Sequence, residues 1–118
     1  MADPADDPQP VLPLSPPVFH VLLALGDGTS HGYAIMQAFE ELTDGREHLL
    51  PGTLYATLAR MAESGLLEEA APPDPDADAR RRYYRVTPWG RRVAAAESER
   101  MRMLLDVAVG RGLAPERA

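Results

Sequence analysis

Apolar residues recur at helical spacing in three consecutive segments of the chain, each bounded by residues that start or stop helices. The first helix is expected to begin at Ser15, because serine is a good N-cap, and to end at Gly26. The second is expected to be capped by Ser30 and to end at Asp44-Gly45. The short link between the two predicts a sharp change of direction, as in a helix-turn-helix.

The third helix is expected to begin near Pro51 and to end at Gly65, within the segment PGTLYATLARMAESGLL. At 100° per residue, Leu54, Leu58 and Met61 share the buried face. The opposite face is made mostly of small residues, which is unusual for a helix surface that meets only water. Its members are Gly52, Thr53, Ala56, Ala59, Arg60 and Glu63.

A β-hairpin and a long helix are expected to follow. Residues 66–71 and RRRYYRVT (80–87) have strand character, and a polar loop joins them. Thr87 and Pro88 suit the start of a helix that runs to about residue 110. The second half of this helix is apolar over a wide arc, so we expect it to form a dimer interface. The interface residues would be Met101, Leu104, Leu105 and Ala108.

Four segments are therefore expected. Residues 1–14 form an acidic, proline-rich, disordered tail, 15–87 a DNA-binding domain, 88–110 the dimerisation helix and 111–118 a frayed tail. The fold class is mostly α with a small β-hairpin (α+β), a winged helix-turn-helix followed by a dimerisation helix. In that fold the third helix enters the major groove of DNA and the hairpin lies along the backbone.

Composition limits the chemistry of the chain. It has 118 residues and no cysteine, which excludes disulfides, thiolate catalysis and cysteine-based zinc sites. Its three histidines have no ligand spacing, and no nucleophile or phosphate-binding motif is present, so we expect no enzyme, metal or cofactor. No membrane span or signal peptide is visible, and a cytoplasmic location is expected.

The net charge of −6 argues at first against DNA binding, but the distribution of charge allows a locally basic patch on an acidic protein. All 12 basic residues are arginine, and seven of them fall within residues 51–92. The candidate DNA contacts are the exposed side of the third helix and the start of the second strand. They are Gly52, Thr53, Tyr55, Ala56, Arg60, Arg80, Arg81, Arg82 and Tyr83, while Tyr33 and Tyr84 are expected to pack in the core.

Three motifs together resemble the PadR family of bacterial transcriptional regulators. They are HGYAI (31–35), PGTLYATLARMAESGLL (51–67) and RRYYRVTPWG (81–90), and the resemblance covers about residues 16–109. The length is similar to that of the short subgroup, which has a single C-terminal dimerising helix. The resemblance implies a homodimeric repressor that binds an inverted-repeat operator in double-stranded DNA. It also implies that a small hydrophobic effector releases the DNA in some members.

The chain departs from the family pattern at three places. The wing tip carries Asp74, Asp76 and Asp78, which oppose phosphate, and the third helix has alanine at positions 56 and 59. Where relatives place an inward aromatic residue, this chain has Met101 and Met103, which are the candidate effector-pocket residues. Two alternatives remain open at this point: a winged-helix module that binds a partner protein, and a carrier of small molecules.

Overall fold

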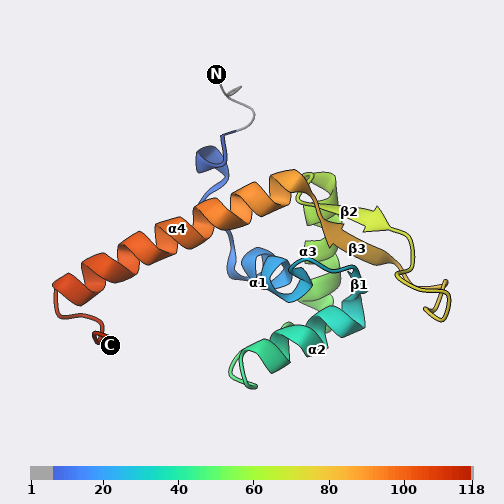
Figure 1. The fold of residues 1–118 in the computed structure, drawn as a ribbon, viewed down its shortest axis with the longest axis horizontal. Coiled ribbons are helices and arrows are strands. Elements are labelled where there is room, and N and C mark those ends of the chain that lie inside the picture. The colour runs from blue at the N-terminus through green and yellow to red at the C-terminus, as the bar shows by residue number, and fades with distance from the viewer. Residues whose placement is uncertain (1–6, 118) are drawn as a thin grey trace.

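The computed structural model describes residues 7–117, in which three helices and a small sheet surround one core and a long fourth helix crosses over them (Figure 1). The helices are α1 (Pro16–Leu25), α2 (Gly32–Leu42), α3 (Pro51–Glu63) and α4 (Pro88–Gly110). The strands are β1 (Ser30–His31), β2 (Leu67–Ala70) and β3 (Tyr83–Val86). This order confirms the expected α+β, winged helix-turn-helix class.

One apolar cluster holds α1, α2, α3 and the sheet together. The predicted inner face of α3 is buried, with Leu54, Leu58 and Met61 each at most 1% exposed. Thr57, expected at the edge of that face, is fully buried as well. The other members of the core are Val21, Leu22, Leu25, Ile35, Phe39, Leu49, Leu66, Leu67, Tyr84, Val86 and Val93. Burial of these side chains fixes the direction of α3, whose opposite face stays in solvent.

The sheet has three strands in the order β1-β3-β2, whereas the sequence predicted a two-stranded hairpin. β1 pairs with β3 through His31 opposite Tyr83, and β2 pairs with β3 through Glu69 opposite Tyr84. Ser30 was expected to cap α2, but it belongs to β1. The N-cap of α2 is His31, whose Nδ1 accepts a hydrogen bond from the Ala34 N–H at 3.3 Å.

Hydrogen bonds hold the start of α4 against the end of α3. Gly65 ends α3 with φ +81°, a left-handed conformation that glycine adopts without strain. The Thr87 hydroxyl donates a hydrogen bond to the Gly65 carbonyl at 2.6 Å and accepts one from the Gly90 N–H at 2.9 Å. A Cβ on Gly90 would lie 2.2 Å from the Leu66 carbonyl oxygen, so α4 begins in close backbone contact with the end of α3.

The expectation of a disordered tail over residues 1–14 is wrong for residues 9–14, and residues 1–6 lie outside the described part. A short 3₁₀ turn, Gln9–Val11, leads into Leu12 and Leu14, which pack against the core. The Leu14 N–H donates to Glu97 Oε2 of α4 at 2.5 Å, and Glu97 is fully buried. We call residues 9–14 the N-terminal arm. Two leucines and a buried acceptor on α4 give this proline-rich segment a fixed position.

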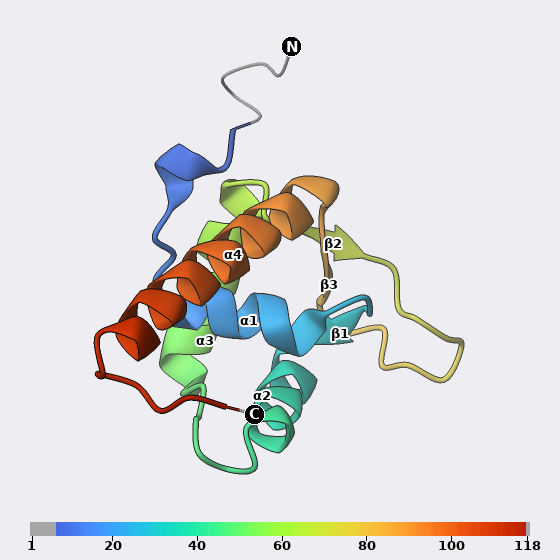
Figure 2. The same cartoon turned by 60° about the vertical axis from the view of Figure 1, so that its left-hand side comes forward.

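The first half of α4 packs on α1 and the arm, and the second half extends beyond the core (Figures 1 and 2). Met101, Met103, Leu104, Leu105 and Val107 are between 40% and 56% exposed in the single chain. The expected frayed tail begins with an ordered turn, in which the Leu113 N–H donates to the Ala108 carbonyl at 2.8 Å. No helix among residues 7–117 is long and apolar enough to cross a membrane.

Candidate nucleic-acid interface

The outer face of α3 is open and almost free of long side chains. Gly52, Thr53, Ala56, Ala59 and Arg60 are all exposed, and no atom lies within 4 Å of the position that a Cβ on Gly52 would take. The side chain of Arg60 forms no hydrogen bond or ion pair with any residue of the described range. A surface of this shape lets a helix backbone approach base edges closely, with the exposed Arg60 as its one cation.

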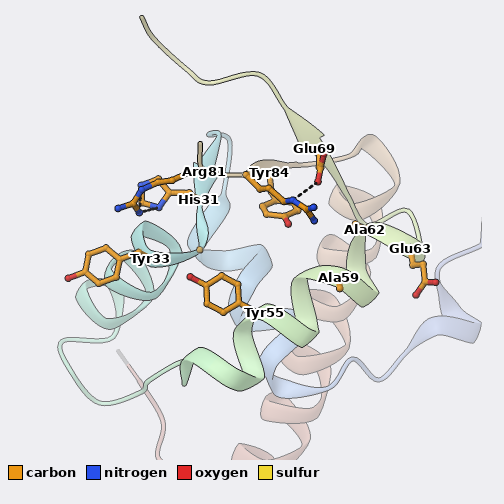
Figure 3. A pocket seen from close by; sticks show the side chains of 11 residues that line it. His31, Tyr33, Tyr55, Ala59, Ala62, Glu63, Glu69, Arg81 and Tyr84 are labelled. Atoms are coloured by element: carbon orange, nitrogen blue, oxygen red, sulfur yellow. Dashed lines mark hydrogen bonds and ion pairs between the residues drawn. The ribbon is translucent and has the colours of Figure 1, made fainter. Parts of the chain in front are cut away.

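Tyr55 leaves this face and leans towards α2. Its side chain is 56% exposed, and its ring lies so close to Gly32 that a Cβ there would meet Cε1 at 2.7 Å. Figure 3 shows the ring projecting from α3 towards the first turn of α2. Tyr33, expected in the core, is 52% exposed instead, and its hydroxyl accepts a hydrogen bond from Gln37 Nε2 at 3.3 Å. Two tyrosine side chains are thus accessible beside α3.

We call β2, β3 and the connecting loop 71–82 the wing. Each of its arginines is paired with a carboxylate. Arg80 and Arg81 contact Asp78 at 3.2 Å and 3.8 Å, Arg82 contacts Glu69 at 3.8 Å, and Arg85 contacts Glu68 at 2.7 Å. Hydrogen bonds from Arg80 hold the pKa of Asp78 below its ordinary value. The positive and negative charges of the wing therefore nearly cancel.

Tyr83 does not face outward as expected for a DNA contact. It is 5% exposed, and its hydroxyl donates to the Asp78 carbonyl oxygen at 3.0 Å. Strand alternation predicts that only one of Tyr83 and Tyr84 is buried. Both tyrosine side chains are buried. The α-helices cover one face of β3, and the wing loop folds back over the other face.

A hollow of about 590 Å³ separates α3 from the wing (Figure 3). Tyr55, Ala59 and Glu63 line it from α3, and Arg81 and Arg82 line it from the wing. His31, at the start of α2, lies on the boundary between this hollow and a second one of about 360 Å³ next to the wing loop. Two arginines, two carboxylates and several tyrosine side chains therefore line the hollow beside the outer face of α3.

The remaining candidate residues lie on α4. Met101 and Met103 are 40% and 51% exposed on the surface of the single chain, so a pocket lined by them would need a second copy of the chain. Trp89 is partly buried at the start of the helix, with the Arg92 guanidinium 5.4 Å from its ring centre. No group of three or more potential metal ligands occurs among the described residues.

Comparison with known proteins agrees with this geometry. The sequence profile of the "Transcriptional regulator PadR-like family" matches residues 21–96, which include α2, α3, the wing and the start of α4. The chain belongs to the PadR-like family. The members of this family are transcriptional regulators. This PadR-like chain is therefore a transcriptional regulator with a DNA-binding fold.

Individual relatives support the assignment. A transcriptional regulator of Mycobacterium tuberculosis is 40% identical over 90 residues, which are 75% of this chain and 76% of that protein. An uncharacterised 37.1 kDa transposon protein of Streptomyces fradiae is 38% identical over 84 residues, 71% of this chain, and the match spans 22% of that protein's length.

Solved structures share the fold. A transcriptional regulator from Clostridium thermocellum has a TM-score of 0.67 and 26% identity, over 80% of this chain and 87% of that chain. A PadR family regulator from Clostridium difficile has a TM-score of 0.68 and 22% identity, over 81% and 97% of the two chains. The second likeness concerns the fold alone.

Several contributors to the interface were not foreseen from the sequence. The pairing of Glu68 with Arg85 follows from the hairpin register, and an acidic residue opposite an arginine was a usable signal for it. Glu69 lies opposite Tyr84 and reaches Arg82 instead. The contact between Arg81 and His31, 50 residues apart in the chain, had no such signal. It depends on β1 joining the sheet.

Proposed function

We propose that this PadR-like regulator is a homodimeric repressor that binds an inverted-repeat operator through α3 and the wing. The observation that carries the proposal is the outer face of α3, where small residues surround the unpaired Arg60. Thr53, Tyr55 and Arg60 would contact bases or the adjacent backbone. Few side chains remain on this face, so DNA shape would contribute to specificity as well.

The wing would supply phosphate contacts. Arg80, Arg81 and Arg82 have side chains that are 91%, 45% and 79% exposed, and their carboxylate partners Asp78 and Glu69 are 36% and 61% exposed. Exposed ion pairs contribute about 0–1 kcal/mol, so a DNA phosphate can replace the carboxylate at little cost. Asp78 and Glu69 would then turn towards solvent. The acidic residues of the wing thus reduce the affinity for DNA without preventing binding.

A dimer would place two α3 helices on one face of the DNA. The exposed apolar side chains of α4, among them Leu104 and Leu105, are the surface on which a second copy would pack. Because Thr87 ties the start of α4 to the end of α3, the angle between two α4 helices would set the spacing of the α3 helices. Half-sites about 34 Å apart require a defined spacing.

An effector would act on that spacing. Met101 and Met103 would lie close to the partner helix, and methionine adapts to ligands of varied shape. A small apolar molecule bound there would change the angle between the α4 helices and release the operator. By releasing the operator, the effector would relieve repression.

The test is a DNA-binding titration on a duplex from the region upstream of the protein's own gene. Arg60→Ala should weaken operator binding by about 1–3 kcal/mol, and Arg81→Ala should weaken binding to all duplexes and lower the salt slope by about one unit. Arg111→Ala is the matched control, because Arg111 lies at the far end of α4. An unchanged slope for Arg81→Ala would contradict the wing contact. A clean dimer that shifts no DNA would favour the partner-protein alternative.

A further inference from the structure

The start of α2 carries a histidine that contacts the wing. His31 Nδ1 accepts the N–H of Ala34 at 3.3 Å and lies 2.8 Å from Arg81 Nη1. The ring of Tyr83 meets the imidazole edge-on, with centres 5.6 Å apart. The Ala34 N–H is a donor only, so this capping bond uses the lone pair of Nδ1 and requires a neutral imidazole. Arg81 Nη1 also lies 3.4 Å from Nε2, so the guanidinium contacts both ring nitrogens.

We propose that His31 and Arg81 together form a phosphate site at the base of the wing, and that His31 takes up a proton when DNA binds there. This inference rests on the proposed DNA-binding function. Arg81 is the wing arginine shared by both hollows, and its partner Asp78 is 3.8 Å away. A phosphate that replaces His31 and Asp78 as the partner of Arg81 leaves the Ala34 N–H as the remaining donor to Nδ1, and a proton from solvent can then displace that single bond.

In the free protein, the surroundings of His31 disfavour its protonation. Burial, and then the charge of Arg81, hold the pKa of His31 below its ordinary value of 6.5, against a smaller opposite effect of Asp78. Protonation would also remove the acceptor that caps α2. A phosphate reverses the balance, because an anion near an imidazole favours its charged form. The complex therefore binds the proton more tightly than the free protein does.

Carboxylates, arginines and tyrosines share the two hollows with His31, and histidine is the side-chain type that changes charge between about pH 5 and 8. The carboxylates are Asp74, Asp78, Glu63 and Glu69, and the cations are Arg81 and Arg82. Near this site His31 is thus the group that changes charge between about pH 5.5 and 8.

The consequence is a pH dependence of DNA affinity. By linkage, affinity must rise as the pH falls, because the complex binds more protons. The rise is at most about tenfold for each unit by which DNA raises the pKa of His31. His31→Asn keeps a side-chain acceptor for the Ala34 N–H, since asparagine is a good N-cap, but it cannot take up a proton.

The experiment measures fluorescence anisotropy of a labelled mixed-sequence duplex of about 30 base pairs, long enough for two half-sites, at about pH 5.5 and 8. Affinity of the wild-type protein should rise on acidification, and His31→Asn should lose most of that rise. His48→Asn is the matched control and should behave as the wild type, because His48 faces Glu40 away from the wing. An equal rise in wild type and His31→Asn would overturn the proposal.

A second measurement uses the wild-type protein alone. An NMR titration of the His31 ring should give a higher pKa with the duplex bound than without it, and an equal or lower pKa would overturn the proposal. A wild-type protein that binds no duplex at either pH would instead contradict the proposed function. The two failures are therefore distinguishable.

Discussion

Replacing Glu97 by alanine should destabilise the protein strongly, although the residue lies on a helix with a largely exposed surface. The carboxylate is fully buried, accepts the Leu14 N–H at 2.5 Å, and also accepts a hydrogen bond from Arg100 Nε. The hydrogen bond from Arg100, and to a smaller extent that from Leu14, lower the pKa of Glu97, whereas its burial raises it. The change removes the acceptor that attaches the N-terminal arm to α4.

The expected loss of stability follows from the N–H that the substitution leaves unpaired and from the void that it creates. Leu14 is partly buried, and an N–H left unpaired there costs about 1–3 kcal/mol. The deleted carboxylate leaves a small void, for which about 1 kcal/mol is reasonable by comparison with methylene deletions. Arg100 is 31% exposed and can turn to solvent, so its loss adds little. The total is about 2–4 kcal/mol, or a fall of roughly 8–16 °C in Tm for a domain of this size.

Urea unfolding followed by circular dichroism measures this difference, at one fixed protomer concentration because dimerisation would add to stability. Glu99→Ala is the matched control, since Glu99 also pairs with an arginine three residues later but is 74% exposed. It should cost less than about 0.5 kcal/mol. Glu97→Gln keeps an acceptor and should cost about half as much as Glu97→Ala.

Equal effects of Glu97→Ala and Glu99→Ala would refute the reasoning, because the arm would then add nothing to the fold. The pH dependence gives a second check. A carboxyl whose pKa is lowered on folding stabilises the protein above its ordinary pKa of 4.5, and this stabilisation is lost as the pH falls through the lowered value. The difference between wild type and Glu97→Gln should therefore shrink below about pH 4.5.

Three further predictions concern the helix α4 and the wing. Leu105→Asp should lower the sedimentation mass to that of a monomer without unfolding the chain, and an unchanged mass would contradict the proposed dimer surface. Gly90→Ala should cost about 1–3 kcal/mol in urea unfolding because of the clash with Leu66, whereas Gly110→Ala, with open space around it, should be neutral or stabilising. The lowered pKa of His31 means that the free protein loses stability as the pH falls below 6.5, and His31→Asn should reduce that loss in unfolding experiments at two pH values.

The helices and their inner faces were predictable because local rules decide them. Pro16, Gly65 and Thr87 mark helix ends through backbone geometry, and the spacing of Leu54, Leu58 and Met61 defines one face of a helix wherever it lies. The motifs of α2, α3 and β3 were sufficient to assign the family. The small outer face of α3 was visible for the same reason, since it is the complement of the buried one.

The errors occurred where distant segments meet. Ser30 has good capping chemistry, but pairing of residues 30–31 with β3 makes it part of a strand and gives the cap to His31. Tyr33 was expected to be buried and Tyr83 exposed. The tertiary structure reverses both, because Tyr33 lies on the open side of α2 while the wing loop covers Tyr83.

The sequence alone thus determined the order of the elements, the face that each helix buries and the family to which the chain belongs. Only the tertiary structure decided which distant charges are neighbours: Glu69 beside Arg82, the histidine beside Arg81, and the buried Glu97 that holds the N-terminal arm. The physical reason is the separation, along the sequence, of the residues that interact. Helix periodicity and capping depend on residues a few positions apart, whereas these contacts join residues up to 83 positions apart, which the folded core brings together.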